Sequence, residues 1–265
     1  MAQRISTLGE ITDRFDVVLS DVWGVLHNGV SAFPDAAIAL EAARKAGLTV
    51  VLITNSPRPA PGVIPQLRAL GVPDTAYDRI ITSGDVTREL ISQGPKKVFL
   101  LGPERDMPLL DGLDVEVVSQ EEATAVVCTG FFDDETETPE DYTDMLKSFV
   151  ARSVPMICAN PDLVVERGER IIPCAGAMAL YYEQLGGEVR IAGKPHSPIY
   201  EACLSAAREV HGEFSKDRVL AIGDGMPTDV KGAINAGLEL LYIAGGIHAA
   251  DYALNGEIDE TLLKD

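Results

Sequence analysis

Residues 17–26 read VVLSDVWGVL and give the strongest indication of the fold. The stretch begins as a run of apolar, partly β-branched side chains, which is typical of a strand buried on both faces. Asp21 follows that strand at once, and Gly24 permits a tight turn behind it. In open α/β sheets ligands bind where strands end, so this acid stands where a functional group is expected. An isolated strand-end acid more often caps a turn, and the inference therefore depends on the rest of the chain.

Short apolar runs of the same kind recur along the sequence. We expect strands at 15–19, 49–53, 98–101, 125–128, 156–159, 189–192, 218–222 and 239–243. Helical spacing predicts helices at 35–46, 84–92, 139–151, 177–185 and 197–209. Strands that alternate with helices of this length predict an α/β protein with right-handed βαβ units and a parallel sheet.

Composition sets the class of protein and argues against several partners. The 265 residues are 46% hydrophobic, and 22 basic against 41 acidic residues give a formal net charge of -19, which repels nucleic acid and anionic membrane. Because the chain has no eighteen-residue apolar stretch and no signal-like N-terminus, we expect a cytoplasmic protein without membrane contact. Four widely spaced cysteines predict reduced, buried thiols.

Two polar clusters follow other predicted strands. Thr54 and Asn55 offer hydroxyl and N–H groups that suit phosphate oxygens, although a cap or an Asx turn would use the same residue types. Lys194 stands between a glycine and a proline, which is an unusual setting for a lysine. It would be either an ordinary exposed charge or a group that neutralises a phosphoryl oxygen.

The last cluster, LAIGDGMPTD at 220–229, places two acids across the passage from a strand into a helix. Asp224 can form a simple turn with the next glycine, and Asp229 suits the first turn of a helix, where the macrodipole favours an acid. Those explanations account for each acid alone but not for the pair. Hard oxygen ligands at such a point suit magnesium.

Together these segments resemble the haloacid dehalogenase (HAD) superfamily of aspartate-nucleophile hydrolases, in that family's order and over nearly the whole chain. ITNS at 53–56, ANPD at 159–162 and GKP at 193–195 are most similar to class IIA, the NagD-like phosphatase branch. The resemblance implies a Rossmann-like HAD core at 1–83 and 188–265 and an inserted α/β cap of the C2 type at 84–187. It also implies that the cap helps to select the substrate and can form a homodimer interface.

The same resemblance assigns roles in phosphoryl transfer. Asp21 would attack phosphorus to form an aspartyl phosphate, while Thr54, Asn55 and Lys194 would bind the transferring phosphate. The chain would then be a phosphatase for small phosphorylated metabolites, either sugar phosphates or nucleotides.

The resemblance also implies a magnesium site. The carboxylates of Asp21 and Asp224 and the main-chain carbonyl of Trp23 would ligate Mg²⁺, and Asp229 would orient a water on the metal.

Trp23 departs from the family pattern, because family phosphatases usually carry there a second acid that serves the leaving group. Losing such an acid costs about 10²–10⁴ in rate. Either His27 or His196 moves the proton, or the leaving group needs none, as in an acyl phosphate. An aromatic residue there is also similar to haloacid dehalogenases, although retention of both acids at 224 and 229 argues for phosphoryl chemistry. A chain without turnover would instead be a regulatory protein that binds a phosphometabolite.

Overall fold

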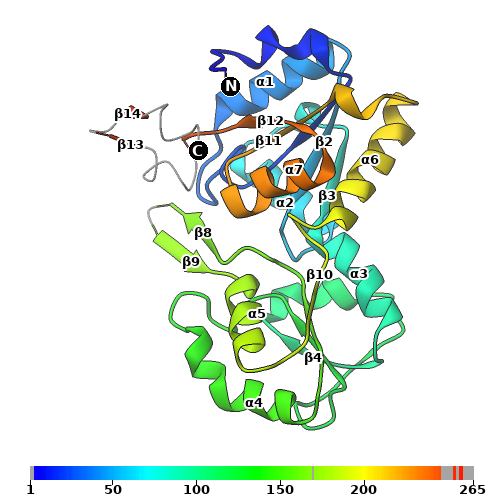
Figure 1. Ribbon diagram of the computed structural model, residues 1–265, viewed down its shortest axis with the longest axis vertical. Helices are drawn as coiled ribbons and strands as arrows, with labels where there is room; N and C mark the ends of the chain where they lie inside the picture. Colours follow the sequence, from blue (N-terminus) through cyan, green and yellow to red (C-terminus); the bar gives the residue numbers. More distant parts are fainter. Residues whose placement is uncertain (1–2, 169, 246–252, 255–256, 259–265) are drawn as a thin grey trace. The chain divides into compact units, whose positions relative to one another are not determined.

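The computed structural model describes residues 3–168, 170–245, 253–254 and 257–258 (Figure 1). The chain divides into two compact units. The first unit comprises Met1–Ile53, Gln66–Ile80 and Tyr200–Asp265, and the second comprises Thr54–Pro65 and Ile81–Ile199. Each unit is built around a five-stranded sheet. In both sheets, all the strand pairs whose register is described are parallel, so the predicted α/β class is confirmed.

The sheet of the first unit has the strand order β12-β11-β1-β2-β3. Its strands are β1 (Val17–Ser20), β2 (Thr49–Thr54), β3 (Arg79–Thr82), β11 (Val219–Gly223) and β12 (Glu239–Tyr242). Every residue of β1, β2 and β11 is buried, as expected for central strands covered on both faces. Ser20 pairs with Ile222, so the residues that follow β1 and β11 emerge side by side at the carboxyl edge.

The helices assigned wholly or partly to the first unit are α1 (Pro34–Lys45), α2 (Ala60–Leu70), α6 (Ser197–His211) and α7 (Lys231–Ala236). Proline in the first turn begins α1, and basic residues in its last turn complement the helix dipole. The structure also has 3-10 turns η1 (Leu8–Glu10), η2 (Thr12–Arg14), η3 (Asp74–Ala76) and η6 (Lys216–Arg218) and a π-helical turn, η7 (Met226–Val230). The last of these turns carries one of the predicted acids.

The sheet of the second unit has the order β10-β7-β6-β4-β5. Its strands are β4 (Lys97–Leu101), β5 (Glu116–Val117), β6 (Ala125–Cys128), β7 (Met156–Cys158) and β10 (Val189–Ile191). The central strand β6 alternates between two cores. Val126 and Cys128 face one with α4 (Thr143–Ala151) and α5 (Ala175–Gln184), whereas Ala125 and Val127 face another with α3 (Ser83–Gln93) and the 3-10 turn η4 (Glu104–Leu110) (Figure 1).

Two antiparallel hairpins form separate two-stranded sheets. One joins β8 (Val164–Arg167) to β9 (Arg170–Pro173) in the second unit, and the other joins β13 (Ala253–Leu254) to β14 (Glu257–Ile258). A turn, η5 (Pro139–Tyr142), opens α4 with a capping box between Thr138 and Asp141. The acidic segment before it, residues 132–138, forms a loop.

The sequence-based elements are largely confirmed, with ends that move by a few residues. The strands β3, β5, β8 and β9 were not predicted, because they are short and, apart from β3, exposed or only partly buried along most of their length. The second unit contains the predicted cap, 84–187, and extends beyond it on both sides. The assignment of 1–83 and 188–265 to a catalytic core stays a prediction.

The structure also bears on two other expectations, the burial of the cysteines and the absence of a membrane-spanning helix. All four cysteines are buried and form no disulfide, as predicted. Burial raises the pKa of Cys158 to about 12, so this thiol stays protonated and unreactive at neutral pH. No helix in the described ranges is both long and apolar enough to cross a membrane.

Candidate active site

Three predicted acids gather in the first unit. Asp21 directly follows β1 and donates its main-chain N–H to the carbonyl of Ile222 on β11, at 2.8 Å. Asp224 directly follows β11, and Asp229 lies in the π-helical turn η7. One ligand oxygen from each carboxylate lies within 4.8 Å of the others, and the three residues are only 4–5% exposed. Because β1 and β11 are adjacent parallel strands in matched register, they bring together Asp21 and Asp224, which are about two hundred residues apart in sequence.

Glycines make this close approach possible. Gly24 has a φ of +87°, and a Cβ built on it would lie 2.2 Å from Oδ2 of Asp224. A Cβ on Gly223 would lie 2.2 Å from Cγ of Asp229, so that carboxyl packs directly on the strand backbone. Oδ2 of Asp229 also accepts the N–H of Gly225 at 3.1 Å. The acids are thus held against bare backbone, and any side chain at 24 or 223 would displace them.

The arrangement fits a hard divalent cation. Three buried carboxylates at this spacing carry like charges that a cation would neutralise, and oxygen is the ligand type that such ions prefer. The glycine cradle around Asp224 and Asp229 keeps side chains out of their surroundings. We conclude that these three acids can hold a divalent metal.

Trp23 is packed into its own loop. The far edge of its indole lies against Gly29, where an added Cβ would meet Cζ2 at 2.4 Å. Its ring also meets the His27 ring edge to face, with 5.0 Å between centroids and 69° between planes. Isolated bridges pair Trp23 with His27 and His27 with Ala32, so the loop forms a small β-like flap. Trp23 is thus part of the packing of this flap.

The two histidines proposed to move a proton have different environments. His27 belongs to the first unit, is 2% exposed, and accepts the N–H of Gly29 on Nδ1 at 3.0 Å. This hydrogen bond assigns the proton of the neutral ring to Nε2. His196 belongs to the second unit, is exposed, and donates its main-chain N–H to Gly193 at 2.9 Å.

The predicted phosphate-binding residues lie in the second unit. Thr54 is 5% exposed, and its Oγ1 accepts the N–H of Ser56 at 3.2 Å. The Asn55 side chain accepts the main-chain N–H of Lys194 at 2.8 Å and donates to Oδ1 of Asp162 at 2.8 Å. Lys194 itself is 2% exposed, so it is not an ordinary surface charge. The Asn55 amide therefore ties the lysine loop to the loop that follows β7.

Asp162 is the main residue of this network that sequence reasoning did not select. It lies in the ANPD segment, where its own N–H donates to the Asn160 side chain at 3.0 Å. Its carboxylate orients the Asn55 amide, which in turn fixes the backbone of Lys194. The segment stands out in the sequence as a family signature, but nothing in its pattern indicates a contact with Asn55.

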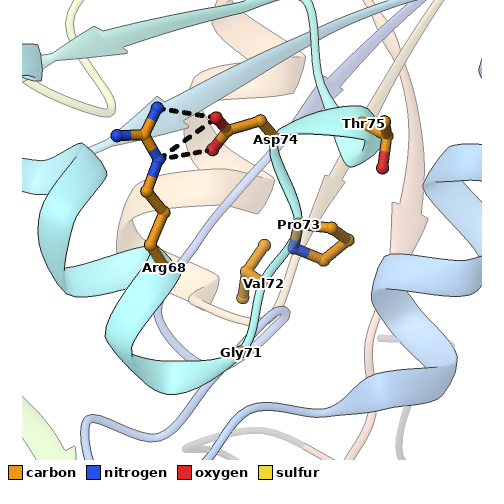
Figure 2. Close-up of a pocket in the computed structure, with 6 residues that line it drawn as sticks. All are labelled: Arg68, Gly71, Val72, Pro73, Asp74 and Thr75. Carbon is orange, nitrogen blue, oxygen red and sulfur yellow. Dashed lines mark hydrogen bonds and ion pairs between the residues drawn. The ribbon is translucent and has the colours of Figure 1, made fainter.

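A surface depression in the first unit contains none of the predicted site residues (Figure 2). It is lined by Arg68, Gly71, Val72, Pro73, Asp74 and Thr75. Its two charged groups bind one another, because Nε of Arg68 lies 2.9 Å from Asp74 and the terminal nitrogen Nη2 lies 2.6 Å from it. This depression therefore offers no catalytic group.

Comparison with known proteins agrees with this geometry. A family model described as haloacid dehalogenase-like hydrolase matches residues 18–116, and a second HAD-like hydrolase model matches 191–263. A crystal structure of a haloacid dehalogenase-like hydrolase from Brucella suis 1330 shares 56% identity and a TM-score of 0.92, covering 98% of this chain and 97% of that one. The chain belongs to the haloacid dehalogenase-like hydrolase family.

More distant relatives narrow the branch within the HAD family. The ribonucleotide monophosphatase NagD of Escherichia coli K12 is 27% identical over 242 residues, 88% of this chain and 89% of that protein. An acid sugar phosphatase of Staphylococcus epidermidis is 24% identical over 252 residues, 94% of this chain and 93% of that protein. The chain is thus a HAD hydrolase of the NagD-like class IIA, as its motifs indicate.

Proposed function

We propose that this HAD hydrolase is a magnesium-dependent phosphatase that acts on small phosphorylated metabolites of the sugar phosphate or nucleotide class. The observation that carries the proposal is the buried cluster of Asp21, Asp224 and Asp229 at the carboxyl ends of two adjacent parallel strands. Two of its relatives, a ribonucleotide monophosphatase and an acid sugar phosphatase, support the same substrate class.

Asp21 is the proposed nucleophile. Its carboxylate would form a bond to phosphorus while the bond from phosphorus to the leaving oxygen breaks, which gives an aspartyl phosphate. Water would then cleave that acyl phosphate and return the carboxylate. Splitting the reaction in this way replaces one difficult displacement by two easier ones.

The other predicted residues would hold charge during transfer. Lys194 and Thr54 would bind phosphoryl oxygens, and the Asn55 amide supports this role by fixing the Lys194 backbone. Asp21, Asp224, Asp229 and the Trp23 carbonyl would hold the magnesium ion. When bound, that ion offsets the negative charge of the three carboxylates and of the phosphoryl group.

The residue at position 23 affects whether the leaving group can be protonated. Segment 22–33 contains no acid, lysine or arginine, and the indole N–H of Trp23 is a donor that does not release its proton at neutral pH. We therefore expect aryl and acyl phosphates, whose leaving groups depart without protonation, to be hydrolysed faster than alkyl phosphates by about 10²–10⁴.

The direct test is phosphate release from a panel of sugar phosphates, nucleotides, an acyl phosphate and p-nitrophenyl phosphate, with magnesium or with a chelator. Asp21→Asn should abolish release, because the amide cannot act as the nucleophile. Asp16→Asn is the matched control: Asp16 lies at the opposite end of β1 and binds Arg218 through two contacts of 2.7 Å. It should keep full activity.

Four results would contradict the proposal. Release that is unaffected by a chelator would exclude the metal-dependent mechanism, and release that survives Asp21→Asn would exclude this nucleophile. Halide release from chloroacetate without any phosphatase activity would favour dehalogenation instead. Tight binding of phosphometabolites with no turnover would indicate a regulatory protein.

A further inference from the structure

The start of α3 packs directly against the loop that follows Thr54. A capping box at Thr82 fixes where this helix begins. Two residues later, Gly84 donates its main-chain N–H to the carbonyl of Ser56 at 3.0 Å. A Cβ on Gly84 would lie 2.2 Å from the carbonyl oxygen of Pro57, so the helix touches the loop backbone. The first turn of α3 therefore has little freedom to move relative to this predicted phosphate-binding segment.

Ser83, in the same turn, faces the other predicted phosphate-binding segment, the Lys194 loop. A Cβ built on Gly193 would lie 2.6 Å from Oγ of Ser83, 2.7 Å from Oδ1 of Asn55 and 2.8 Å from Cδ of Pro161. Three side chains therefore enclose the α-carbon of the residue that precedes the lysine. The same Asn55 oxygen accepts the N–H of Lys194 at 2.8 Å. The backbone that leads into the lysine is thus held by side chains of three different segments.

The Ser83 hydroxyl has an unfavourable environment for folding. Ser83 is fully buried, and its Oγ makes no hydrogen bond with any residue that the structure describes. A buried hydroxyl without a partner destabilises the folded state, and such groups are rare in native proteins. Alanine at this position would avoid that cost and is the better helix former. Residues that break such rules are typical of functional positions, and this one contacts the backbone beside Lys194.

Thr87 lies one turn further along α3 and provides a comparison. It is also fully buried, and its Oγ1 likewise makes no hydrogen bond with a described residue. Its hydroxyl is not among the three atoms that enclose Gly193. The two hydroxyls therefore share a helix and a degree of burial, and they differ in the contact with the Lys194 loop.

We propose that Ser83 is a positioning residue for phosphate binding, whose hydroxyl oxygen holds the α-carbon of Gly193 in place and thereby sets the direction of Lys194. The inference rests on the proposed function, in which Lys194 binds a phosphoryl oxygen. An oxygen accepts the weakly polar Cα–H of a glycine and so allows a close approach. Asn55 fixes the N–H of Lys194, and Ser83 fixes the carbon before it. Because the ammonium ends a flexible four-carbon chain, a small turn of this backbone displaces it further than the backbone itself moves.

The test is phosphate binding, measured without turnover by calorimetric titration of inorganic phosphate in the presence of magnesium. Ser83→Ala should weaken binding about three- to tenfold, because the space left by Oγ lets Gly193 shift and misplaces the lysine. Its Tm should stay unchanged or rise, since the variant removes an unpaired buried hydroxyl. A merely structural role for Ser83 would lower the Tm and leave the phosphate affinity unchanged. Thr87→Val removes the comparison hydroxyl, is the matched control and should bind phosphate as the wild type does.

A double-mutant cycle with Gly193→Ala assigns the effect to this one contact. In the wild type the new methyl group would overlap Oγ of Ser83, so phosphate binding should weaken about tenfold. In the Ser83→Ala background one of the three enclosing atoms is gone, and the further loss should be smaller by about threefold or more. In the Thr87→Val background it should stay about tenfold. The same loss in all three backgrounds would overturn the inference. If Gly193→Ala does not fold, the affinity and Tm of Ser83→Ala decide the question.

The outcomes separate this inference from the proposed function. If the wild type hydrolyses phosphate esters but Ser83→Ala binds phosphate equally well, the inference is overturned and the phosphatase proposal stands. A fall in both the affinity and the Tm of Ser83→Ala would indicate general loosening and also overturn the inference, as would a wild type that binds no phosphate. Weaker binding at an unchanged or higher Tm, in a protein that releases phosphate from no ester, supports the inference and overturns the phosphatase proposal.

Discussion

The acid cluster of the first unit and the Lys194 loop of the second unit are built in opposite ways. Asp224 and Asp229 rest on bare backbone at Gly24 and Gly223, where an added Cβ would come within 2.2 Å of their carboxyl atoms. Lys194, in contrast, is placed by a side chain, because the Asn55 amide accepts its N–H at 2.8 Å. One arrangement requires that side chains be absent, whereas the other requires a particular side chain.

This difference determines which substitutions each unit tolerates. Close backbone approach leaves no room to adjust, because strand and turn backbones cannot move without breaking the sheet. A hydrogen-bonded amide can be replaced by a group of similar shape, which keeps some partners and loses others. Small substitutions should therefore be most damaging in the first unit, and chemically conservative ones should be informative in the second.

Gly24→Ala should have the largest effect. The new methyl group would overlap Oδ2 of Asp224, and the φ of +87° is strained for any residue with a Cβ. Displacing a carboxylate by about 1 Å costs on the order of 10² in rate, so we expect at least that loss in phosphatase activity and weakened magnesium binding. Calorimetric titration with magnesium and steady-state kinetics would measure both.

Gly47→Ala is a control that separates the steric overlap with Asp224 from the backbone strain of a positive φ. Gly47 has a φ of +100°, yet a Cβ added there would meet nothing within 4 Å. Both variants should lose about 1–2 kcal/mol of stability from the left-handed conformation, but only Gly24→Ala should lose magnesium. Equal metal affinities in the two variants would show that the close approach at Gly24 is not needed for the metal site.

Asn55→Ala should have the next largest effect. It removes the acceptor for the Lys194 N–H and the donor to Asp162, both at 2.8 Å, in a buried location. We expect a loss of about 2–3 kcal/mol in the free energy of unfolding and a fall in activity of on the order of 10²-fold, because the lysine loop is no longer fixed. Chemical denaturation and kinetics on p-nitrophenyl phosphate would test this.

Asn55→Asp tests the role of the same amide through the pH dependence of stability. It keeps an acceptor for Lys194 but places a second carboxyl where the amide now donates to Asp162. One of the two carboxyls must then have a raised pKa in the folded state, so the variant is more stable below that pKa and loses stability as the pH rises through it. Its stability deficit against wild type should be larger at pH 8 than at pH 5. An equal deficit at both values would mean that the 55–162 contact is not tight.

The first unit's acids could be predicted because their positions follow from topology. Asp21 and Asp224 each come directly after a strand that is apolar throughout, and such strands are parallel and adjacent when helices connect them. Periodicity and strand ends are local features of the sequence. The same argument predicts Thr54, which is the last residue of β2, and Lys194, which lies beyond the end of β10.

The remaining residues could not be predicted because their roles depend on partners distant in sequence. Asp106 lies in an irregular turn with no apolar period, so no local pattern marks it as a buried residue. Trp23 could have stacked on a substrate or packed in place, and only its contacts with Gly29 and His27 decide that it packs within its loop. Contacts of this kind depend on tertiary structure, which local pattern does not determine.

The smallest effect should come from ion pairs, which also differ between the units. In the second unit, Asp134 receives two hydrogen bonds from Arg167, at 3.0 and 2.8 Å, and this ties the acidic loop to the hairpin β8–β9. In the first unit, Arg68 and Asp74 form an exposed pair whose side chains are 61% and 52% accessible. Asp134→Asn should loosen the hairpin at a cost of about 1 kcal/mol, whereas Asp74→Asn should cost a few tenths at most.

The pH dependence of the hairpin follows from the direction of the Asp134 shift. Hydrogen bonds from Arg167 lower the pKa of this carboxyl below its ordinary value. Its contribution is therefore complete above the unfolded-state pKa of about 3.9 and is lost as the pH falls through the lower folded-state value. Amide resonances of β8 and β9 should differ between wild type and Asp134→Asn by a constant amount from pH 5 to 8 and converge below about pH 4. Convergence already near pH 6 would mean that another group holds the hairpin, because a carboxylate stabilised by arginine cannot take up a proton there.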